Sequence, residues 1–429
     1  MQRNHRFAAR AAVAAVASSF AWIVAASGAH GQASQVHETA TLRAQLPGAG
    51  EALGNAVALD GDVLVVGAPI DGTVTAPGSV LIFERSAPGQ WQEVMRFFAD
   101  VPTNFDLLGG AVDVDGDTAV AGCVFDGTSG GRGSVYVYVR DVGGLWSQTQ
   151  RLLSSDGRVF DEFGADVALD GDVLAVGAPR HELSANPNED SGAVYVFERA
   201  AGTWTEVAKV VPAMLGISAR FGLGLDLEAG TLVATTRAAG GAYVFTGAGA
   251  TWTEQVRLDS PIVSSQVDFL RDLSLSGDTL LVGAITDASS GLNTGAVNVW
   301  RGAGDTWILE DRLHSPTPAA GDQFGVSIAL QGDVAIVGSW GDDEGGSSAG
   351  SASLWTRTGT AWHGRRELLS GARAASDLLG RAVAVDATTF AAGAPGADGV
   401  GGGPANVGAV LLLELGARTG TPFCFGDGG

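Results

Sequence analysis

The sequence has few basic residues and few charges of any kind. It contains 25 Lys and Arg against 47 Asp and Glu, a formal net charge of −22, and charged residues make up only 17% of it. Binding to phosphate backbones or anionic lipid surfaces depends on clustered Lys and Arg, so this composition argues against a nucleic-acid partner. It also differs from the composition of helical repeats, which are rich in Ala, Glu and Lys.

Cysteine and histidine are scarce as well. Cys123 and Cys424 lie far apart, with neither CxxC spacing nor enough thiols for a disulfide framework, and Cys123 is expected to be a small buried side chain. The histidines show no metal-ligand pairing, and His181-Glu182 is expected to be a solvated pair in a loop. Because no catalytic constellation is found, we expect that the chain is not an enzyme.

Long apolar runs are confined to the N-terminus. Arg3, Arg6 and Arg10 precede an Ala-rich run over residues 11–26, and small residues follow it. The run is shorter than the roughly 20 residues that a membrane-spanning helix needs, which favours a signal peptide over the alternative of a membrane anchor. We therefore predict a signal peptide over residues 1–33, cleaved near Ala29 or Ala33, and a secreted, periplasmic or cell-surface protein with no later membrane span.

Glycine is abundant, at 64 of 429 residues, and recurs in a repeated unit. Each unit opens with a hydrophobic residue, followed in six of the seven by glycine; the starts are Leu53, Leu108, Phe163, Phe221, Phe269, Phe324 and Leu379. A tight turn such as Asp60-Gly61-Asp62 follows, which is typical of a type I′ hairpin, and then a small-residue motif such as Gly177-Ala178-Pro179. A third strand and a fourth, which begins with tryptophan in six units, complete the pattern, and these tryptophans are interpreted as packing residues.

Seven units of four strands without a helical period predict an all-β fold, a seven-bladed β-propeller of antiparallel blades over residues 34–415. Residues 416–429 are expected to be a tail outside the ring. No fourth strand follows the third strand of the last unit, at residues 408–414, whereas residues 38–46 form a predicted strand that belongs to no unit. We therefore predict that this N-terminal strand completes the last blade and closes the ring.

The order of these motifs, clearest at residues 163–197, resembles the FG-GAP repeat of integrin α propellers and of many exported bacterial proteins. The resemblance covers about residues 38–415 and implies extracellular recognition or adhesion. Many members carry calcium loops of the Asp-x-Asp-x-Asp-Gly kind, but here only Asp113-Val114-Asp115-Gly116-Asp117 has three alternating carboxylates. Alternation along a strand does not build a cage around an ion, so we expect no cofactor and no metal site, with a weak Ca²⁺ interaction at most.

The candidate binding site is an acidic loop face. In an up-and-down blade, the loops between the second and third strands and those between blades emerge on the same face. Aspartates recur in both sets of loops: Asp71, Asp106, Asp126, Asp161, Asp268, Asp287, Asp322, Asp342, Asp343, Asp377 and Asp398. We expect this face to bind an extracellular protein or glycan. The alternatives are aspartates that cap turns, a propeller enzyme such as a hydrolase or lyase, and a structural component of a surface assembly.

Overall fold

The structure, a computed structural model, describes residues 37–69, 77–102, 106–183, 190–237, 241–261, 272–368, 374–399 and 405–414. The predicted signal peptide and C-terminal tail lie outside these residues. No helix in the described ranges is long and apolar enough to cross a membrane.

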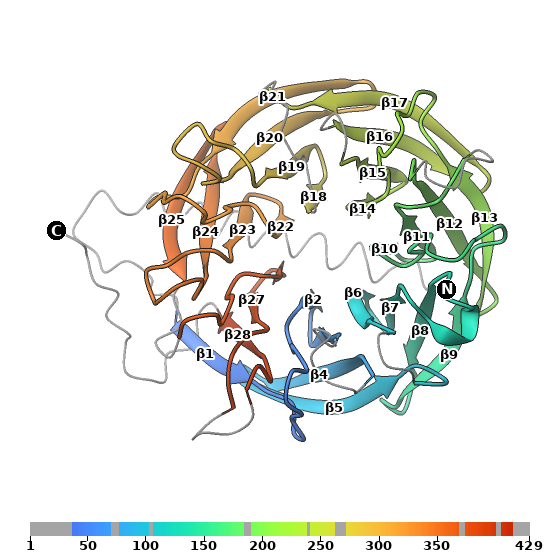
Figure 1. Cartoon of the computed structure of the whole chain (residues 1–429), viewed down its shortest axis with the longest axis horizontal. Coiled ribbons are helices and arrows are strands. Elements are labelled where there is room, and N and C mark those ends of the chain that lie inside the picture. Colours follow the sequence, from blue (N-terminus) through green and yellow to red (C-terminus); the bar gives the residue numbers. More distant parts are fainter. Residues whose placement is uncertain are drawn as a thin grey trace.

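Seven four-stranded antiparallel sheets stand around one axis, which confirms the predicted all-β propeller (Figure 1). The first six blades, from the innermost strand outward, are β2(Ala56–Asp60), β3(Val63–Ala68), β4(Ser79–Ala87), β5(Gln90–Phe98); β6(Leu108–Asp115), β7(Thr118–Cys123), β8(Ser134–Arg140), β9(Trp146–Leu152); β10(Val167–Asp170), β11(Val173–Ala178), β12(Ala193–Ala200), β13(Thr203–Val210); β14(Leu225–Glu228), β15(Thr231–Thr235), β16(Gly241–Ala248), β17(Thr251–Asp259); β18(Leu273–Ser276), β19(Thr279–Ala284), β20(Ala296–Ala303), β21(Thr306–Leu313); β22(Ile328–Gln331), β23(Val334–Ser339), β24(Ser351–Thr358), β25(Ala361–Leu368). A single 3-10 turn, η2(Gly127–Ser129), is the helical element of the described residues.

The last blade contains both ends of the described chain, as predicted. It consists of β26(Val383–Val385), β27(Thr389–Ala394), β28(Ala409–Glu414) and, as its outermost strand, β1(His37–Leu42). β1 pairs antiparallel with β28, with Leu42 opposite Val410. Glu414 also accepts a hydrogen bond from Trp91 Nε1 of the first blade at 3.0 Å. The predicted strand is therefore confirmed, although it ends at Leu42 rather than at residue 46.

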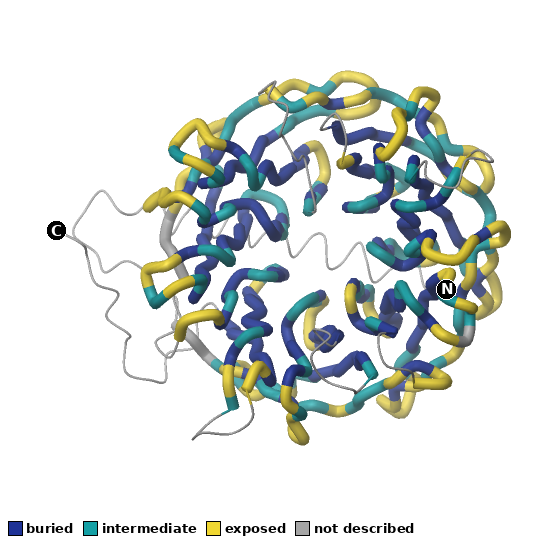
Figure 2. Tube along the Cα trace, in the orientation of Figure 1, coloured by how far each residue is buried: buried dark blue, intermediate teal, exposed yellow. Residues whose placement is uncertain are grey.

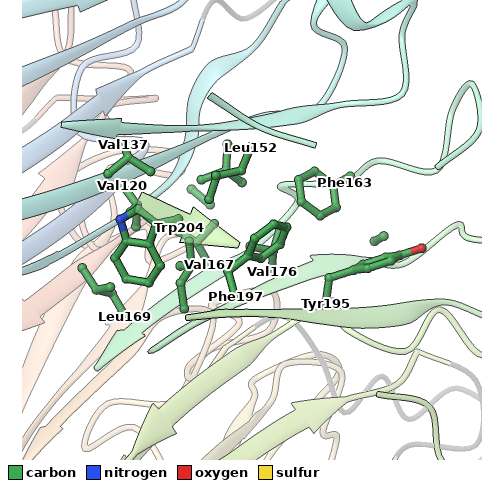
Figure 3. Packing of buried hydrophobic residues seen from close by; sticks show 14 of the residues in the cluster. Val120, Val137, Leu152, Phe163, Val167, Leu169, Val176, Tyr195, Phe197 and Trp204 are labelled. Atoms are coloured by element: carbon green, nitrogen blue, oxygen red, sulfur yellow. The ribbon is translucent and has the colours of Figure 1, made fainter. Parts of the chain in front are cut away.

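The repeated glycines allow close contact between successive blades. A Cβ atom on Gly122 would lie 1.9 Å from the carbonyl oxygen of Gly164, which has a φ of +89°. The neighbouring Phe163 forms an isolated parallel bridge with Gly133 at the start of the preceding blade's third strand. Its ring is fully buried and packs edge-to-face against Tyr195, with the ring centroids 5.5 Å apart (Figure 3). The hydrophobic-glycine pair is thus the joint between one blade and the next.

The predicted turn type is wrong in most blades. In the first blade the two loop residues of the hairpin are Gly61 and Asp62, and only Gly61 has a positive φ, of 60°. A type I′ turn needs positive φ at both positions, whereas a type II′ turn needs glycine at the first position only. In the fourth blade Ala229 and Gly230 both have positive φ, 50° and 77°, as type I′ requires.

The hydrophobic core lies between the blades and is dominated by their second and third strands (Figure 2). Trp146 and Trp204, which begin fourth strands, are 2% and 3% exposed and belong to these clusters, which confirms their packing role. Cys123 is also buried, and its Sγ donates to the carbonyl oxygen of Asp106 at 3.2 Å. The fold therefore leaves the loops at the two ends of the ring as the places where function can reside.

Candidate functional site

Most of the predicted loop-face aspartates are buried and hydrogen-bonded within their own loops. Asp71 and Asp268 lie outside the described residues, and Asp343 and Asp398 are exposed. Seven are less than 9% exposed: Asp106, Asp126, Asp161, Asp287, Asp322, Asp342 and Asp377. This burial favours the turn-cap alternative over direct contact with a ligand. The ligand-binding role of the set stays a prediction.

Three aspartates that lie two residues before the hydrophobic-glycine pair of their unit accept the same kind of hydrogen bond. The backbone N–H three residues earlier donates to the carboxylate of Asp161 at 2.8 Å, of Asp322 at 2.6 Å and of Asp377 at 2.7 Å. In the loops between second and third strands, Asp126 and Asp342 accept from the serine that opens the third strand, at 2.6 and 2.7 Å. The same repeat position therefore has the same structural role in these blades.

The third blade departs from this pattern. His181 occupies the position four residues after the motif glycine, where four other units have aspartate (Asp71, Asp126, Asp287 and Asp342). Its Nδ1 lies 2.7 Å from Asp161 Oδ2, and the two side chains are each only 3% exposed. The expectation that His181 is solvated is wrong, because its side chain is buried and its Nδ1 contacts the buried carboxylate of Asp161.

Lys209, the only lysine in the sequence, lies on the other side of this histidine. It stands opposite Tyr195, where four other blades have an arginine (Arg96, Arg151, Arg257 and Arg312). Lys209 Nζ is 2.6 Å from His181 Nε2 and 2.9 Å from Asp156 Oδ2. Because Nδ1 faces a carboxylate, we assign the proton of a neutral His181 to Nδ1, which leaves Nε2 to accept from the ammonium group.

Asp156 joins the tyrosine to this cluster. Tyr195 Oη donates to Asp156 Oδ1 at 2.6 Å. Partial burial opposes ionisation of Asp156, but the hydrogen bonds from Tyr195 and Lys209 outweigh it and lower the pKa of the carboxyl group. Asp156 is 52% and Lys209 27% exposed, so a carboxylate and an ammonium group face solvent together above a buried His181–Asp161 pair.

Phe160, the residue before Asp161, is an exposed aromatic side chain on a strained backbone. Its φ is 70° and its exposed fraction is 61%. The equivalent positions of the other described units also have positive φ but have small residues: Gly50, Ser218, Gly321 and Ser376. The second unit has Phe105 there, which lies outside the described residues. A bulky residue in the left-handed region is rare, and such strain is concentrated at functional sites.

Further apolar side chains are exposed in the loops that enter and leave the third blade. Val159 is 52% exposed on the entry loop, and Met214 and Ile217 are 84% and 69% exposed on the exit loop. Leu183, 41% exposed, lies in the loop between β11 and β12. Exposed apolar groups on loops of one face are candidates for an interaction surface. We call Phe160, Asp156, Lys209, His181 and Asp161 the third-blade site.

A second group of carboxylates lies at the innermost strands. Asp113, Asp166, Asp226 and Asp272 each accept from the next residue's N–H and from a backbone N–H of the next blade, as Asp113 does from Leu169 at 2.6 Å. Burial, reinforced by neighbouring carboxylates, raises the pKa of Asp113 and Asp272 to about 7 and of Asp226 to about 6, and raises that of Asp166. These aspartates clamp neighbouring blades together.

The run Asp113, Asp115 and Asp117 forms no cage. Asp113 accepts from the backbone N–H groups of Val114 and Leu169. Asp115 accepts from Gly171 N, and Asp117 pairs with Arg140 at 2.7 Å. Among the described residues no cluster of His, Cys, Asp or Glu could hold a metal ion. The expectation of no cofactor, or of weak Ca²⁺ binding, stays a prediction.

Comparison with known proteins identifies the repeat. The FG-GAP repeat matches residues 36–83, 91–138, 146–197 and 307–355, and a search of curated proteins finds no match. A solved periplasmic gluconolactonase, PpgL of Pseudomonas aeruginosa, is similar with a TM-score of 0.50 and 16% identity, covering 75% of this chain and 86% of that one. Sqt1 of Chaetomium thermophilum has a TM-score of 0.48 and 14% identity, with 82% of each chain covered. At 16% identity, the likeness to the gluconolactonase shows the fold alone.

The expectation that the chain is not an enzyme is wrong as an inference from its sequence and fold. A protein with a similar propeller, the periplasmic gluconolactonase, is an enzyme. The absence of a recognisable catalytic motif in the sequence therefore does not exclude catalysis on this scaffold, and the fold by itself does not decide the question.

Proposed function

Because the chain carries FG-GAP repeats closed into a seven-bladed propeller, we propose that it is an extracytoplasmic recognition module whose third-blade loops bind a protein or glycan. The observation that carries the proposal is Phe160, an aromatic ring 61% exposed on a backbone with a φ of 70°. Its neighbours Val159 and Asp161 provide an apolar surface and a rigid attachment to the blade. Recognition residues concentrate on loops that a rigid scaffold holds in place.

The charges around this surface are balanced although the whole chain is acidic. Arg158 pairs with Glu182 at 2.7 Å, and Arg180 lies 3.4 Å from both Glu162 and Asp190. A surface with paired charges and exposed apolar groups has the composition of a polar-rimmed binding site.

The proposed extracytoplasmic location rests on the N-terminal basic and apolar segment. Fractionation of cells, with N-terminal sequencing of the mature chain, tests it: a chain retained uncleaved in the cytoplasm would contradict the proposal.

A matched pair of variants tests recognition by the third-blade loops. Phe160→Ser introduces the residue that two other units have at this position, and Val142→Ser is a control in the β8–β9 turn, on the opposite face, where Val142 is fully exposed. Binding to separate protein and polysaccharide fractions of cell envelopes is measured by biolayer interferometry. Phe160→Ser is expected to bind at least about tenfold more weakly, and Val142→Ser as tightly as the wild type. Equal binding by Phe160→Ser would contradict the proposal.

A second candidate function is hydrolysis at the same place. The Asp161–His181–Lys209 contacts, of 2.7 and 2.6 Å, link groups that can hold and transfer protons. Since His181 is buried, Lys209 and Asp156 would be the groups that meet a substrate. Gluconolactone, the substrate class named for the similar propeller, is the first compound to assay, by proton release at constant pH. Turnover that is lost in Lys209→Met would establish this function, and no turnover above the spontaneous rate would count against it.

A further inference from the structure

We infer that the ligand of the third-blade site is a neutral sugar chain. The inference rests on the proposed function and specifies its ligand. Phe160 provides the surface on which a sugar ring packs, and Lys209 and Asp156 provide a donor and an acceptor for its hydroxyl groups. His181 and Asp161 are positioning residues, because they are buried and act through Lys209 and through the loop that carries Phe160.

Phe160 is the aromatic platform of the third-blade site. Phe160 is 61% exposed, and its backbone N–H donates to the carbonyl oxygen of Gly131 at 2.9 Å, which ties the residue to the second blade. The ring is therefore carried by a backbone that is hydrogen-bonded to the neighbouring blade. An aromatic face presents a flat, electron-rich apolar surface, and the C–H face of a pyranose is the apolar side of a polar molecule.

Lys209 and Asp156 form a polar pair that retains hydrogen-bonding capacity for a ligand. An ammonium group has three donor hydrogens, and the contacts of Lys209 with Asp156 and His181 use two of them. The third is available to a ligand oxygen, since the side chain is 27% exposed. Asp156 accepts from Tyr195 and Lys209 and retains acceptor capacity on a side chain that is 52% exposed. A sugar hydroxyl both donates and accepts, so a fixed ammonium–carboxylate pair suits it.

Comparison with another repeat shows that a blade can pack without a histidine and a lysine at the positions of His181 and Lys209. In the second blade the corresponding residues are Asp126 and Arg151, 3.5 Å apart. The third blade has exchanged both partners, for His181 and Lys209, and still makes a close contact of 2.6 Å. A guanidinium group is planar and suited to bidentate contacts, whereas an ammonium group is compact and has three rotatable donors. The exchange thus replaces a planar guanidinium group by a compact ammonium donor at the surface, while the contact within the blade is kept.

The charges favour a neutral chain over an acidic one. The protein has a formal net charge of −22, which repels acidic polysaccharides. The cations near the site do not offset this repulsion, because Arg158 and Lys209 each contact a carboxylate within 3 Å. A neutral sugar chain is not repelled by the acidic protein, and it can bind without displacing the carboxylates from Arg158 and Lys209.

Affinity electrophoresis in native gels tests the inference. The gels contain dextran, laminarin, xyloglucan or galactomannan as neutral chains, and polygalacturonate as an acidic one. The full chain is run beside Phe160→Ser, the double variant His181→Asp with Lys209→Arg, which restores the residues of the second blade, and Val142→Ser as control. At least one neutral polysaccharide is expected to retard the wild type and Val142→Ser. Its affinity for the other two variants is expected to fall at least about tenfold, with no loss of Tm.

The outcomes separate this inference from the function on which it rests. Retardation by polygalacturonate alone, or equal retardation of the restored double variant, would overturn the inference. Suppose that no neutral polysaccharide retards the wild type, but Phe160→Ser still loses binding to the envelope protein fraction. The sugar inference would then fail, and recognition by the third-blade loops would stand. If Phe160→Ser bound every fraction and polysaccharide as the wild type does, both would fail.

Discussion

Raising the pH from 5 to 8 is expected to destabilise the propeller through the aspartates of its innermost strands. The pKa of Asp272 in the folded chain is raised to about 7, mainly by burial, whereas an aspartate in an unfolded chain has a pKa of about 3.9. The folded state therefore takes up a proton that the unfolded state does not hold in this range. Such a group contributes its full stability below the unfolded pKa and loses it as the pH rises through the folded pKa.

The size of the effect follows from the shift. Between pH 5 and a folded pKa of about 7, one such group changes the free energy of unfolding by at most about 3 kcal/mol, at 1.36 kcal/mol per pH unit. Partial exposure of Asp272 to solvent reduces this to about 1–2 kcal/mol. Asp156 and Asp278, whose pKa values are lowered, lose their stabilising contribution only at more acidic pH, outside this window. Asp113 and Asp226 act in the same direction as Asp272.

Urea denaturation at pH 5 and pH 8 measures the effect in the wild type and in Asp272→Asn. The amide loses an acceptor for Leu273 N or Ile328 N, but this loss is present at both pH values and cancels in the difference. Asp272→Asn is expected to show a pH difference about 1–2 kcal/mol smaller than the wild type. Asp305→Asn, at an exposed position, is the charge-matched control and should behave as the wild type does. A wild type that is more stable at pH 8 than at pH 5 would refute the reasoning.

Three further predictions concern the ring and its ions. Leu42→Ala should destabilise the chain by about 2–4 kcal/mol in calorimetry, because this buried side chain anchors the strand that closes the ring, and an unchanged Tm would contradict that role. Gly122→Ala should abolish soluble folding, since its Cβ would lie 1.9 Å from Gly164 O, whereas Gly216→Ala, with open space around it, should fold normally. Millimolar CaCl₂ should raise the Tm no more than NaCl of equal ionic strength, because the buried loop aspartates already have partners; tight stoichiometric binding in a calorimetric titration would contradict this.

The fold could be predicted from the sequence because its signals are local and steric. Gly122 and Gly164 each occupy a place that no other residue fits, and this requirement recurs in every described joint between blades, so the glycines appear at a regular spacing. The closing strand could be predicted because the last unit lacked one strand. The turn type could not, because the residues of the two-residue loop depend on the strand register, which places Gly61 first rather than second.

The third-blade site was missed because its members come from separate segments of the blade. Asp161 precedes β10, His181 follows β11 and Lys209 lies on β13, so the three residues meet only in the folded blade. The sequence pattern points instead to the acidic loops, but most of their aspartates are buried. One signal was present in the sequence: when the units are aligned, the only lysine replaces an arginine, and a histidine replaces an aspartate in the same unit.

Two substitutions separate the backbone strain at Phe160 from the function of its ring. A non-glycine residue in the left-handed region is destabilised by about 1–2 kcal/mol, and glycine avoids this because it has no Cβ. Phe160→Ala and Phe160→Gly both remove the ring, but only glycine relieves a backbone held at a φ of 70°. Phe160→Gly should therefore be more stable than Phe160→Ala by about 1 kcal/mol in urea denaturation, and both should lose ligand binding to the same degree. If the alanine variant were as stable as the glycine variant, the backbone would be unstrained. Strain at Phe160 would then be no evidence that the ring is retained for binding.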